Sequence, residues 1–464
     1  MEKRVKETRK RRGAVLAARR ISRRRFIQIT GTGLAGVALL EITGCRGGGG
    51  SGGGGSGGGG SGEFTFAMGQ DTTGVLPVLV DNFNTEYEGQ YTANYREMPT
   101  DTGRYFDQLK TEFQAGGGDI DLIGGDVIWP AQLAEPGYIL DLSDRFTEED
   151  RQEFLPGPVE SNTYEGRIYG VPWYTDVGLL YYRQDLLEQS GFSEPPATWD
   201  ELKEQAQKVM QDSGTENGFI FQGSNYEGGV VNGLEYIYSH GGAVLDDNDQ
   251  SKVVIDSPES ARGLQTERSM IEDGVAPQSV TTYTETESEA LFLRGDSVFL
   301  RTWPQLYSKA GDSEQSSIDQ AQLGVAPLPA GEGGRSASGL GGWNFFINAA
   351  SEPETQDAAY EFIRFATSPE QQRFYALEGS RLPTVQELYD DQEVLDAVPV
   401  IRLAGEQTLQ DARPRPVSPF YSDMSLEMAE QFNVSLNGEV SPEEALGTLQ
   451  ESLTEIVEQG QGQT

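Results

Sequence analysis

The chain has 464 residues, with 73 Asp and Glu against 35 Lys and Arg, so its formal net charge is −38. Residues 1–44 contain twelve of the basic residues and three of the acidic ones. This leaves 23 basic and 70 acidic residues, a net charge of −47, from position 45 onward. Such a surface repels nucleic acid and anionic lipid. It also fits a halophilic protein, because in molar salt the Debye length is only ~3 Å and self-repulsion is screened.

The chain has one cysteine, Cys45, and one histidine, His240, which excludes several kinds of site. No disulfide can form within the chain. A zinc site built from His and Cys is excluded, and a nucleophilic triad would have to use His240. We expect no metal and no cofactor. We expect His240, which precedes Gly241-Gly242, to be a turn or helix-end residue.

Residues 1–45 have the pattern of an export signal. Ser22-Arg23-Arg24-Arg25-Phe26-Ile27-Gln28 places paired arginines before an apolar stretch at about 27–40, as in a twin-arginine signal. That stretch is too short for a transmembrane helix, which needs about 20 residues. Ile42-Thr43-Gly44-Cys45 resembles a lipobox, in which the cysteine receives a lipid after cleavage. The alternative, a basic arm that binds nucleic acid, needs neither the apolar stretch nor the cysteine.

Residues 46–62 follow as a Gly/Ser segment, with GGGGSGGGGSGGGGSG at 47–62. Such chains are flexible coils, and sixteen residues reach about 20–24 Å on average. The repeat fits either an engineered linker, to be left out of fold reasoning, or a natural tether. Its position directly behind Cys45 favours the tether.

From residue 63 the pattern alternates between strand and helix. We predict strands at 64–69, 91–97 and 119–125 and helices at 75–87 and 107–114. This alternation indicates an α/β fold with a parallel sheet and helices on its faces.

Later helices are indicated by their first residues. Thr198-Trp199-Asp200-Glu201 has the sequence of a capping box. Ser257 and Ser368 each precede a proline and a glutamate, which is typical of a cap followed by proline at the first helical position. An apolar stripe at 359–366 predicts a further helix just before Ser368.

Five stretches in order resemble the extracellular solute-binding proteins of carbohydrate ABC importers, in particular their trehalose/maltose-binding branch. The resemblance covers about residues 63–455. It is carried by Gly125-Asp126-Val127-Ile128-Trp129-Pro130, by Val171-Pro172-Trp173-Tyr174-Thr175-Asp176 and the residues that follow to Arg183, by Gly295-Asp296 through Arg301-Thr302-Trp303-Pro304, by Gly341-Gly342-Trp343-Asn344-Phe345-Phe346-Ile347, and by Arg413-Pro414-Arg415-Pro416-Val417-Ser418-Pro419-Phe420-Tyr421.

The resemblance implies two α/β lobes, a hinge and a ligand cleft between them. On that basis we expect an N-lobe of residues 63–172 and 328–378 and a C-lobe of residues 173–327 and 379–464. The crossings between the lobes would fall near Val171–Tyr174, Gly324–Pro329 and Ser380–Pro383.

The resemblance also implies a sugar site. A sugar ring needs flat aromatics for its apolar faces and planar hydrogen-bonding groups for its hydroxyls. Either Gln70 or Asp71 would contact ligand, and Arg415 is a rival to Arg413; Trp129 and Trp173 are expected to pack in the core. The expected ligand-binding residues are Gln70, Arg104, Asp126, Tyr174, Asp176, Trp303, Gly341, Trp343, Arg413 and Tyr421.

The implied function is that of a lipid-anchored, extracytoplasmic binding protein, not an enzyme. It would capture a sugar, such as trehalose, maltose or a short oligosaccharide, and deliver it to the permease subunits of an ABC importer. We expect a monomer, held at the membrane through the lipid on Cys45. The alternatives are a secreted glycoside hydrolase with two carboxylates, and a glycan-binding sensor or adhesin ectodomain.

Overall fold

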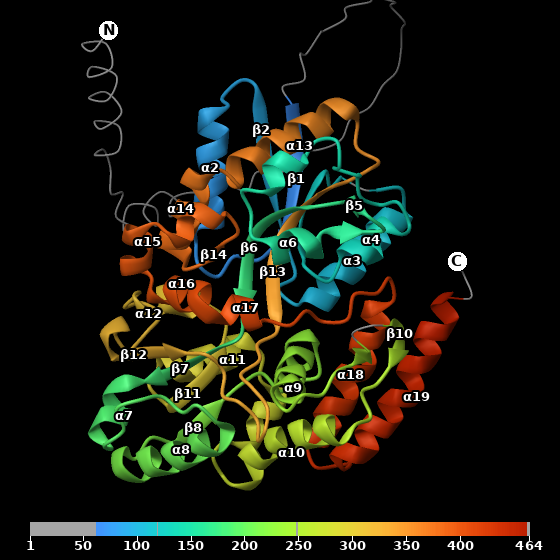
Figure 1. Cartoon of the computed structure of the whole chain (residues 1–464). Coiled ribbons are helices and arrows are strands. Elements are labelled where there is room, and N and C mark those ends of the chain that lie inside the picture. The colour runs from blue at the N-terminus through green and yellow to red at the C-terminus, as the bar shows by residue number, and fades with distance from the viewer. Residues whose placement is uncertain (1–61, 118, 247–248, 462–464) are drawn as a thin grey trace, which may run out of the picture. The chain divides into compact units, whose positions relative to one another are not determined.

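The computed structural model describes residues 62–117, 119–246 and 249–461, which fold around two β-sheets (Figure 1). The larger, six-stranded sheet forms one lobe in the order β14-β6-β13-β3-β1-β2, and a four-stranded sheet in the order β12-β7-β11-β8 forms the other. The strands of the larger sheet are β14 (Leu382–Pro383), β6 (Val171–Val177), β13 (Leu340–Ile347), β3 (Leu122–Asp126), β1 (Gly62–Gly69) and β2 (Tyr91–Met98). Those of the smaller are β12 (Leu323–Ala326), β7 (Leu179–Arg183), β11 (Ser297–Thr302) and β8 (Asn217–Ile220).

The larger sheet is mixed, not wholly parallel as the sequence pattern suggested. Strands β2, β1 and β3 are parallel, whereas β13 runs antiparallel to both β3 and β6. The antiparallel strands come from far along the chain, so the local alternation of strands and helices could not reveal them. Because β1, β2 and β3 are parallel, the loops at their carboxyl ends meet at one edge of the sheet.

Helices cover the N-lobe sheet and bury its apolar side chains. Helix α13 packs on β1 and α2 on β2, and Phe66, Phe83, Phe345 and Phe362 are each fully buried. Trp129 and Trp173 are each 1 % exposed, as expected for core residues. The α-helices of this lobe are α2 (Leu76–Glu86), α3 (Thr102–Gln114), α4 (Pro130–Ala134), α5 (Glu148–Arg151), α6 (Pro156–Ser161), α13 (Pro353–Ala366) and α14 (Pro369–Gly379).

The C-lobe combines the four-stranded sheet with a group of packed helices. Its apolar cores gather side chains of the sheet and of α8 around Phe219 and Leu300, and side chains of α9, α18 and α19 around Phe432. The main helices are α8 (Trp199–Ser213), α9 (Glu227–Ser239), α10 (Pro258–Glu272), α11 (Glu285–Leu293), α15 (Gln392–Ala397), α18 (Tyr421–Leu436) and α19 (Pro442–Gln461).

The chain passes between the lobes at three places. Strand β6 stays in the larger sheet as far as Val177, so the boundary expected at residues 172/173 falls inside a strand and the change of sheet comes at Gly178. The return follows β12, and residue 330 still pairs with Thr198 of the C-lobe, so this crossing lies closer to β13 than residue 328. The last crossing follows β14, because β14 pairs with β6 of the larger sheet and Val385 still pairs with Phe154; the expected crossing at 380–383 and the C-lobe start at residue 379 come too early. Figure 1 shows β6 and β13 side by side where β6 leaves the larger sheet and β13 enters it.

The predicted helix starts are largely confirmed. Thr198, Ser257 and Ser368 each accept a hydrogen bond from the backbone N–H three residues later. The capping box is only half formed, because the Glu201 carboxylate accepts from the N–H of Ala197 instead of that of Thr198. Helix α3 begins at Thr102, earlier than the predicted residue 107, because the Asp101 side chain caps its first turn.

The side chains of His240 and Asn433 form hydrogen bonds within the fold. His240 ends α9, and its ring bonds to the Tyr236 carbonyl oxygen and to the Thr266 hydroxyl, as expected for a helix-end residue. The side-chain amide of Asn433, in an Asn-Val-Ser triplet, donates to two backbone carbonyls within the fold.

Among the described residues, no helix combines the length and the apolar character that crossing a membrane would require. The expected twin-arginine signal, Cys45 and the tether up to residue 61 lie outside the described residues.

Candidate functional site

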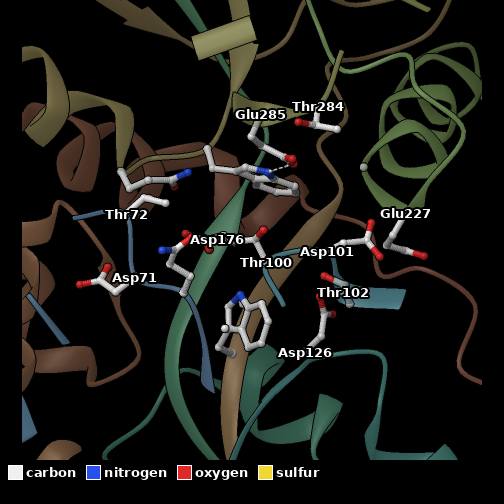
Figure 2. A pocket seen from close by; sticks show the side chains of 18 of the residues that line it. Asp71, Thr72, Thr100, Asp101, Thr102, Asp126, Asp176, Glu227, Thr284 and Glu285 are labelled. Carbon is white, nitrogen blue, oxygen red and sulfur yellow. Dashed lines mark hydrogen bonds between the residues drawn. The ribbon is translucent and has the colours of Figure 1, made fainter. Parts of the chain in front are cut away.

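A cavity of about 260 Å³ lies between the two lobes and is lined from both. The N-lobe contributes the loops at the carboxyl ends of β1, β2 and β3, and the C-lobe contributes the first turns of α9 and α11. Figure 2 shows Asp101, Asp126 and Glu227 on one side of this cavity and Asp71 on the other, with Asp176 between them. Charged and polar side chains from both lobes therefore surround one cavity.

Seven of the ten residues expected to bind ligand line the cavity, and so does Asp71, the alternative to Gln70. Asp71 is held in place because its carboxylate accepts hydrogen bonds from the N–H groups of Thr73 and Leu76. The seven are Gln70, Asp126, Tyr174, Asp176, Trp303, Gly341 and Trp343.

The other three lie outside the cavity lining. Arg104 is exposed on the first turn of α3, and it is the capping residue Asp101 that faces the cavity. The guanidinium of Arg413 lies 5.3 Å from the centre of the Tyr238 ring, whereas its rival Arg415 reaches the cavity. Tyr421 is fully buried behind the cavity.

Asp176 and Arg381 meet at a buried part of the cavity. Arg381 Nη1 lies 3.7 Å from Asp176 Oδ2, and its guanidinium lies 4.7 Å from the centre of the Tyr174 ring. Burial raises the pKa of Asp176 to about 7, against the opposing effect of Arg381. Among the described residues, Asp176 Oδ1 and Arg381 Nε are buried without a hydrogen-bond partner. Buried polar groups are normally paired, so these two atoms are candidates for hydrogen bonds to a ligand.

Arg415 joins the two lobes through an ion triad. Its Nη2 donates to Asp126 Oδ1 of the N-lobe at 2.8 Å, and its Nη1 donates to Glu227 Oε1 of α9 at 2.7 Å. Glu227 also accepts from the hydroxyls of Tyr421, at 2.7 Å, and of Ser425. Burial raises the pKa of Glu227 although Arg415 opposes the shift. Tyr421 therefore supports the site from behind through Glu227.

Trp303 and Trp343 face the cavity from different lobes. The indole N–H of Trp303 donates to Glu285 at 3.1 Å, and the guanidinium of Arg301 lies 4.1 Å from the ring centre. Trp343, on β13, packs edge-on against Trp129 of the N-lobe core. Both indoles are half-buried, so each is fixed by the fold and keeps ring surface toward the cavity.

Gly341 and Gly342 allow the backbone of β13 to approach the cavity closely. A Cβ atom on Gly341 would lie 3.1 Å from the Trp303 ring and 3.2 Å from the Asp176 Cβ. Gly342 has a φ of +133°, which favours glycine. A side chain at Gly341 would narrow the space beside Trp303, and a Cβ atom on Gly342 would lie 2.7 Å from the Tyr174 carbonyl oxygen.

Several lining residues have no counterpart in the sequence motifs. Glu227 sits at a helix start without a recognisable pattern, and Glu285 lies among many other acids. Arg381 falls inside the predicted crossing at 380–383, so an arginine in that segment was an available signal. The ion pair between Lys309 and Glu289, 2.6 Å apart, connects residues twenty positions apart that no local pattern relates.

The site combines flat rings, carboxylates and guanidinium groups, which suits a polyhydroxylated ring. The residues that the structure describes contain no group of three or more His, Cys, Asp or Glu side chains placed to hold a metal ion. The geometry thus provides binding groups for a neutral, hydroxyl-rich ligand.

Comparison with known proteins agrees with this geometry. Residues 69–373 match the family described as bacterial extracellular solute-binding protein. A probable ABC transporter-binding protein of Deinococcus radiodurans is 35 % identical over 80 % of this chain and 87 % of its own. A maltotriose-binding protein of Pyrococcus abyssi is 27 % identical over 67 % of this chain and 64 % of its own.

A solved structure supports the same assignment. Maltose-bound MalE3 of T. maritima is 38 % identical and superposes with a TM-score of 0.79, covering 84 % of this chain and 98 % of that one. The two-lobed fold expected from the sequence is therefore confirmed. The chain belongs to the bacterial extracellular solute-binding proteins, as an extracytoplasmic substrate-binding protein of a sugar ABC transporter.

Proposed function

We propose that the cleft binds a glucose disaccharide such as maltose or trehalose, or a short oligosaccharide, and that the lobes close over it before delivery to the permease. The similarity to a maltose-bound protein and to a maltotriose-binding protein supports this class. Trp303 and Trp343 would stack on the apolar faces of the sugar rings.

The observation that carries the proposal is the pair of unpartnered buried atoms, Asp176 Oδ1 and Arg381 Nε. A buried polar group without a partner costs about 1–3 kcal/mol. One atom accepts a hydrogen bond and the other donates one, so neighbouring sugar hydroxyls satisfy both. Arg415, which is bonded to Asp126 across the lobes, has a further unpartnered buried donor, its Nε.

Calorimetric titration with maltose, trehalose, maltotriose and mannitol tests the proposal, together with thermal unfolding. A bound sugar at ~100 times its dissociation constant stabilises the fold by about 2.7 kcal/mol. We expect a double variant, Trp303→Ala with Trp343→Ala, to lose binding. Leu426→Ala, which truncates an apolar side chain that is 69 % exposed, is the control. Unchanged binding by the double variant, or no response to any sugar, would refute the site.

If the protein were instead a glycoside hydrolase, it would release glucose from the disaccharides. Incubation of the protein with maltose and trehalose, followed by chromatography, distinguishes the two functions. We expect both disaccharides to be recovered intact, because a binding protein holds its ligand without breaking it. Release of glucose by wild type but not by Asp176→Asn would establish the enzyme instead.

We further propose that the protein is exported by its twin-arginine signal and anchored by a lipid on Cys45. The order of signal, lipobox and Gly/Ser segment in the sequence supports this. Mass spectrometry of the protein from its native membrane is expected to find lipid on Cys45. A soluble form that starts elsewhere, or a Cys45→Ser variant that still partitions with membranes, would contradict the anchor.

We also propose that the protein is a monomer adapted to molar salt. The charge of −47 after residue 44 implies strong self-repulsion at low ionic strength. The melting temperature is expected to rise from 0.1 M to 2 M KCl, and light scattering in 2 M KCl should give the mass of one chain. A melting temperature that falls over this range would contradict the halophilic adaptation.

A further inference from the structure

A buried ion pair connects one wall of the cleft to the hinge. Arg301 of β11 and Glu235 of α9 are each 2 % exposed. Arg301 donates to both carboxylate oxygens of Glu235, through Nε at 2.7 Å and Nη2 at 2.6 Å, and through Nη1 to Gln222 Oε1 at 3.2 Å. This bidentate geometry fixes the plane of the guanidinium group.

The hinge side of the pair consists of two lobe crossings. Gly178, between β6 and β7, packs so closely that a Cβ atom there would lie 2.0 Å from Glu235 Oε1. The N–H of Gly339, just before β13, donates to the same oxygen at 3.0 Å. Ser338 joins the two crossings, because its hydroxyl donates to the Gly178 carbonyl oxygen at 2.7 Å. One carboxylate thus contacts two of the three segments that must turn when the lobes move.

The cleft side of the pair is Trp303. Its ring centre lies 4.1 Å from the guanidinium carbon of Arg301, within the range of a cation–π contact. One face of the indole is therefore covered by Arg301, and a sugar in the cavity stacks on the surface that remains. A ligand that fixes the indole also fixes the guanidinium beneath it.

We propose that the Glu235–Arg301 pair is a positioning element that couples sugar stacking on Trp303 to closure at Gly178 and Gly339. This inference rests on the proposed function, since it needs a sugar in the cleft. The pair does not touch the ligand. It transmits the ligand's position because displacing Gly339 from Glu235 breaks a hydrogen bond to a buried charge, which is costly in a low-dielectric interior.

The first test separates binding from closure in Arg301→Lys. Lysine keeps a positive charge but loses the two-pronged contact and the flat stacking surface. Maltose affinity is measured by calorimetry, and closure by the change in radius of gyration between sugar-free and maltose-saturated protein in small-angle scattering. Arg364→Lys, at an arginine whose side chain is 66 % exposed, is the matched control.

We expect Arg301→Lys to bind maltose about tenfold more weakly, within the usual range of coupling between sites. At saturating maltose its radius of gyration should stay close to the sugar-free value, while the wild type and Arg364→Lys contract. A merely structural role would lower the melting temperature yet leave closure intact. Normal contraction at saturation would therefore overturn the inference.

Gly178→Ala perturbs the same pair from the hinge side, at a residue that does not line the cavity. Its new methyl group must displace the Glu235 carboxylate, so we expect the same loss of closure. Gly447→Ala, where a Cβ atom meets nothing within 4 Å, is its control. If Arg301→Lys fails to fold, this variant decides the question by the same two measurements. Failure of the wild type to bind maltose would overturn the proposed ligand and this inference with it, whereas normal closure of the variants overturns the inference alone.

Discussion

Replacing Arg415 by methionine tests the energetic weight of the ion triad at the cleft. The substitution keeps an apolar stem of similar length and removes both contacts, to Asp126 at 2.8 Å and to Glu227 at 2.7 Å. The side chain of Arg415 is only 4 % exposed, so both carboxylates lose their cation in a poorly solvated place. The perturbation therefore leaves two uncompensated buried charges.

The magnitude follows from what each carboxylate retains. Removing one partner of a buried ion pair costs about 3–5 kcal/mol. Glu227 keeps its bonds from Tyr421 and Ser425, whereas among the described residues Asp126 keeps one hydrogen bond, from the N–H of Ile128 at 3.2 Å. We expect Arg415→Met to lower the free energy of unfolding by about 3–4 kcal/mol, a large part of the 5–15 kcal/mol typical of a domain.

The loss has a pH signature. The pKa of Glu227 is already raised by burial in the wild type, and without Arg415 it rises further. A carboxyl whose pKa is higher in the folded than in the unfolded state binds its proton more tightly when folded. Its stabilising contribution is complete below the unfolded pKa, near 4.3, and is lost as the pH rises through the folded pKa. The deficit of the variant should therefore be larger at pH 8 than at pH 5.

Urea unfolding of the sugar-free protein, followed by tryptophan fluorescence at both pH values and constant ionic strength, measures the deficit against wild type. Arg364→Met breaks an exposed pair with Glu361 and should cost less than about 0.5 kcal/mol. A deficit for Arg415→Met below about 1 kcal/mol, or one that is the same at pH 5 and pH 8, would refute the reasoning.

Three further outcomes can be measured. Because the pKa of Asp176 is raised to about 7 in the folded state, its stabilising contribution is lost as the pH rises through 7. The unfolding free energy of the wild type should therefore fall between pH 5 and pH 8 more steeply than that of Asp176→Asn. Burial and, secondarily, Glu235 raise the pKa of Glu267 to about 8. Glu267→Gln should therefore increase the unfolding free energy at pH 7.5 by about 2 kcal/mol. A decrease would contradict this reasoning. Gly341→Ala places a methyl group 3.1 Å from the Trp303 ring and should weaken maltose binding by about tenfold or more in calorimetry, with a change in melting temperature of only a few degrees.

Much of the fold was predictable because local signals and family motifs agree. The strands at 64–69 and 91–97 and the helix at 75–87 lie within a residue or two of β1, β2 and α2. Caps such as Ser257 and Ser368 are set by a single side chain and its nearby N–H groups, so the sequence alone reveals them. What local patterns could not give is the antiparallel insertion of β13 between β3 and β6, which depends on residues more than 150 positions apart.

The same distinction holds for the site. Trp303, Trp343 and Asp176 were predictable because they lie in motifs that surround strand ends. Arg104 was a plausible donor by type, yet the capping role of Asp101 turns Asp101 and not Arg104 toward the cavity. Glu227 owes its position to helix α9 and to Arg415, 188 residues away, a relation that no local pattern carries.

Four basic side chains near the cleft suggest why this region keeps buried polar groups in place of apolar ones. Arg301, Lys309, Arg381 and Arg415 all have side chains exposed by 13 % or less, in a chain with only 23 basic residues after position 44. Apolar residues would pack as stably as buried ion pairs. On the proposed function, we expect an apolar cleft to close without ligand, whereas Arg381 and Arg415, each with an unpartnered Nε, would favour closure only when sugar hydroxyls bond to them.

Salt acts differently on the two parts of this charge distribution. The exposed acids are separated from one another by water, so molar salt screens their repulsion. The buried pairs, at 2.6 to 2.8 Å, exclude ions and are screened much less. The surface can therefore adapt to the ionic strength of the surroundings while the chemistry of the cleft stays nearly constant, which is what a receptor needs if its affinity is to follow the sugar and not the salt.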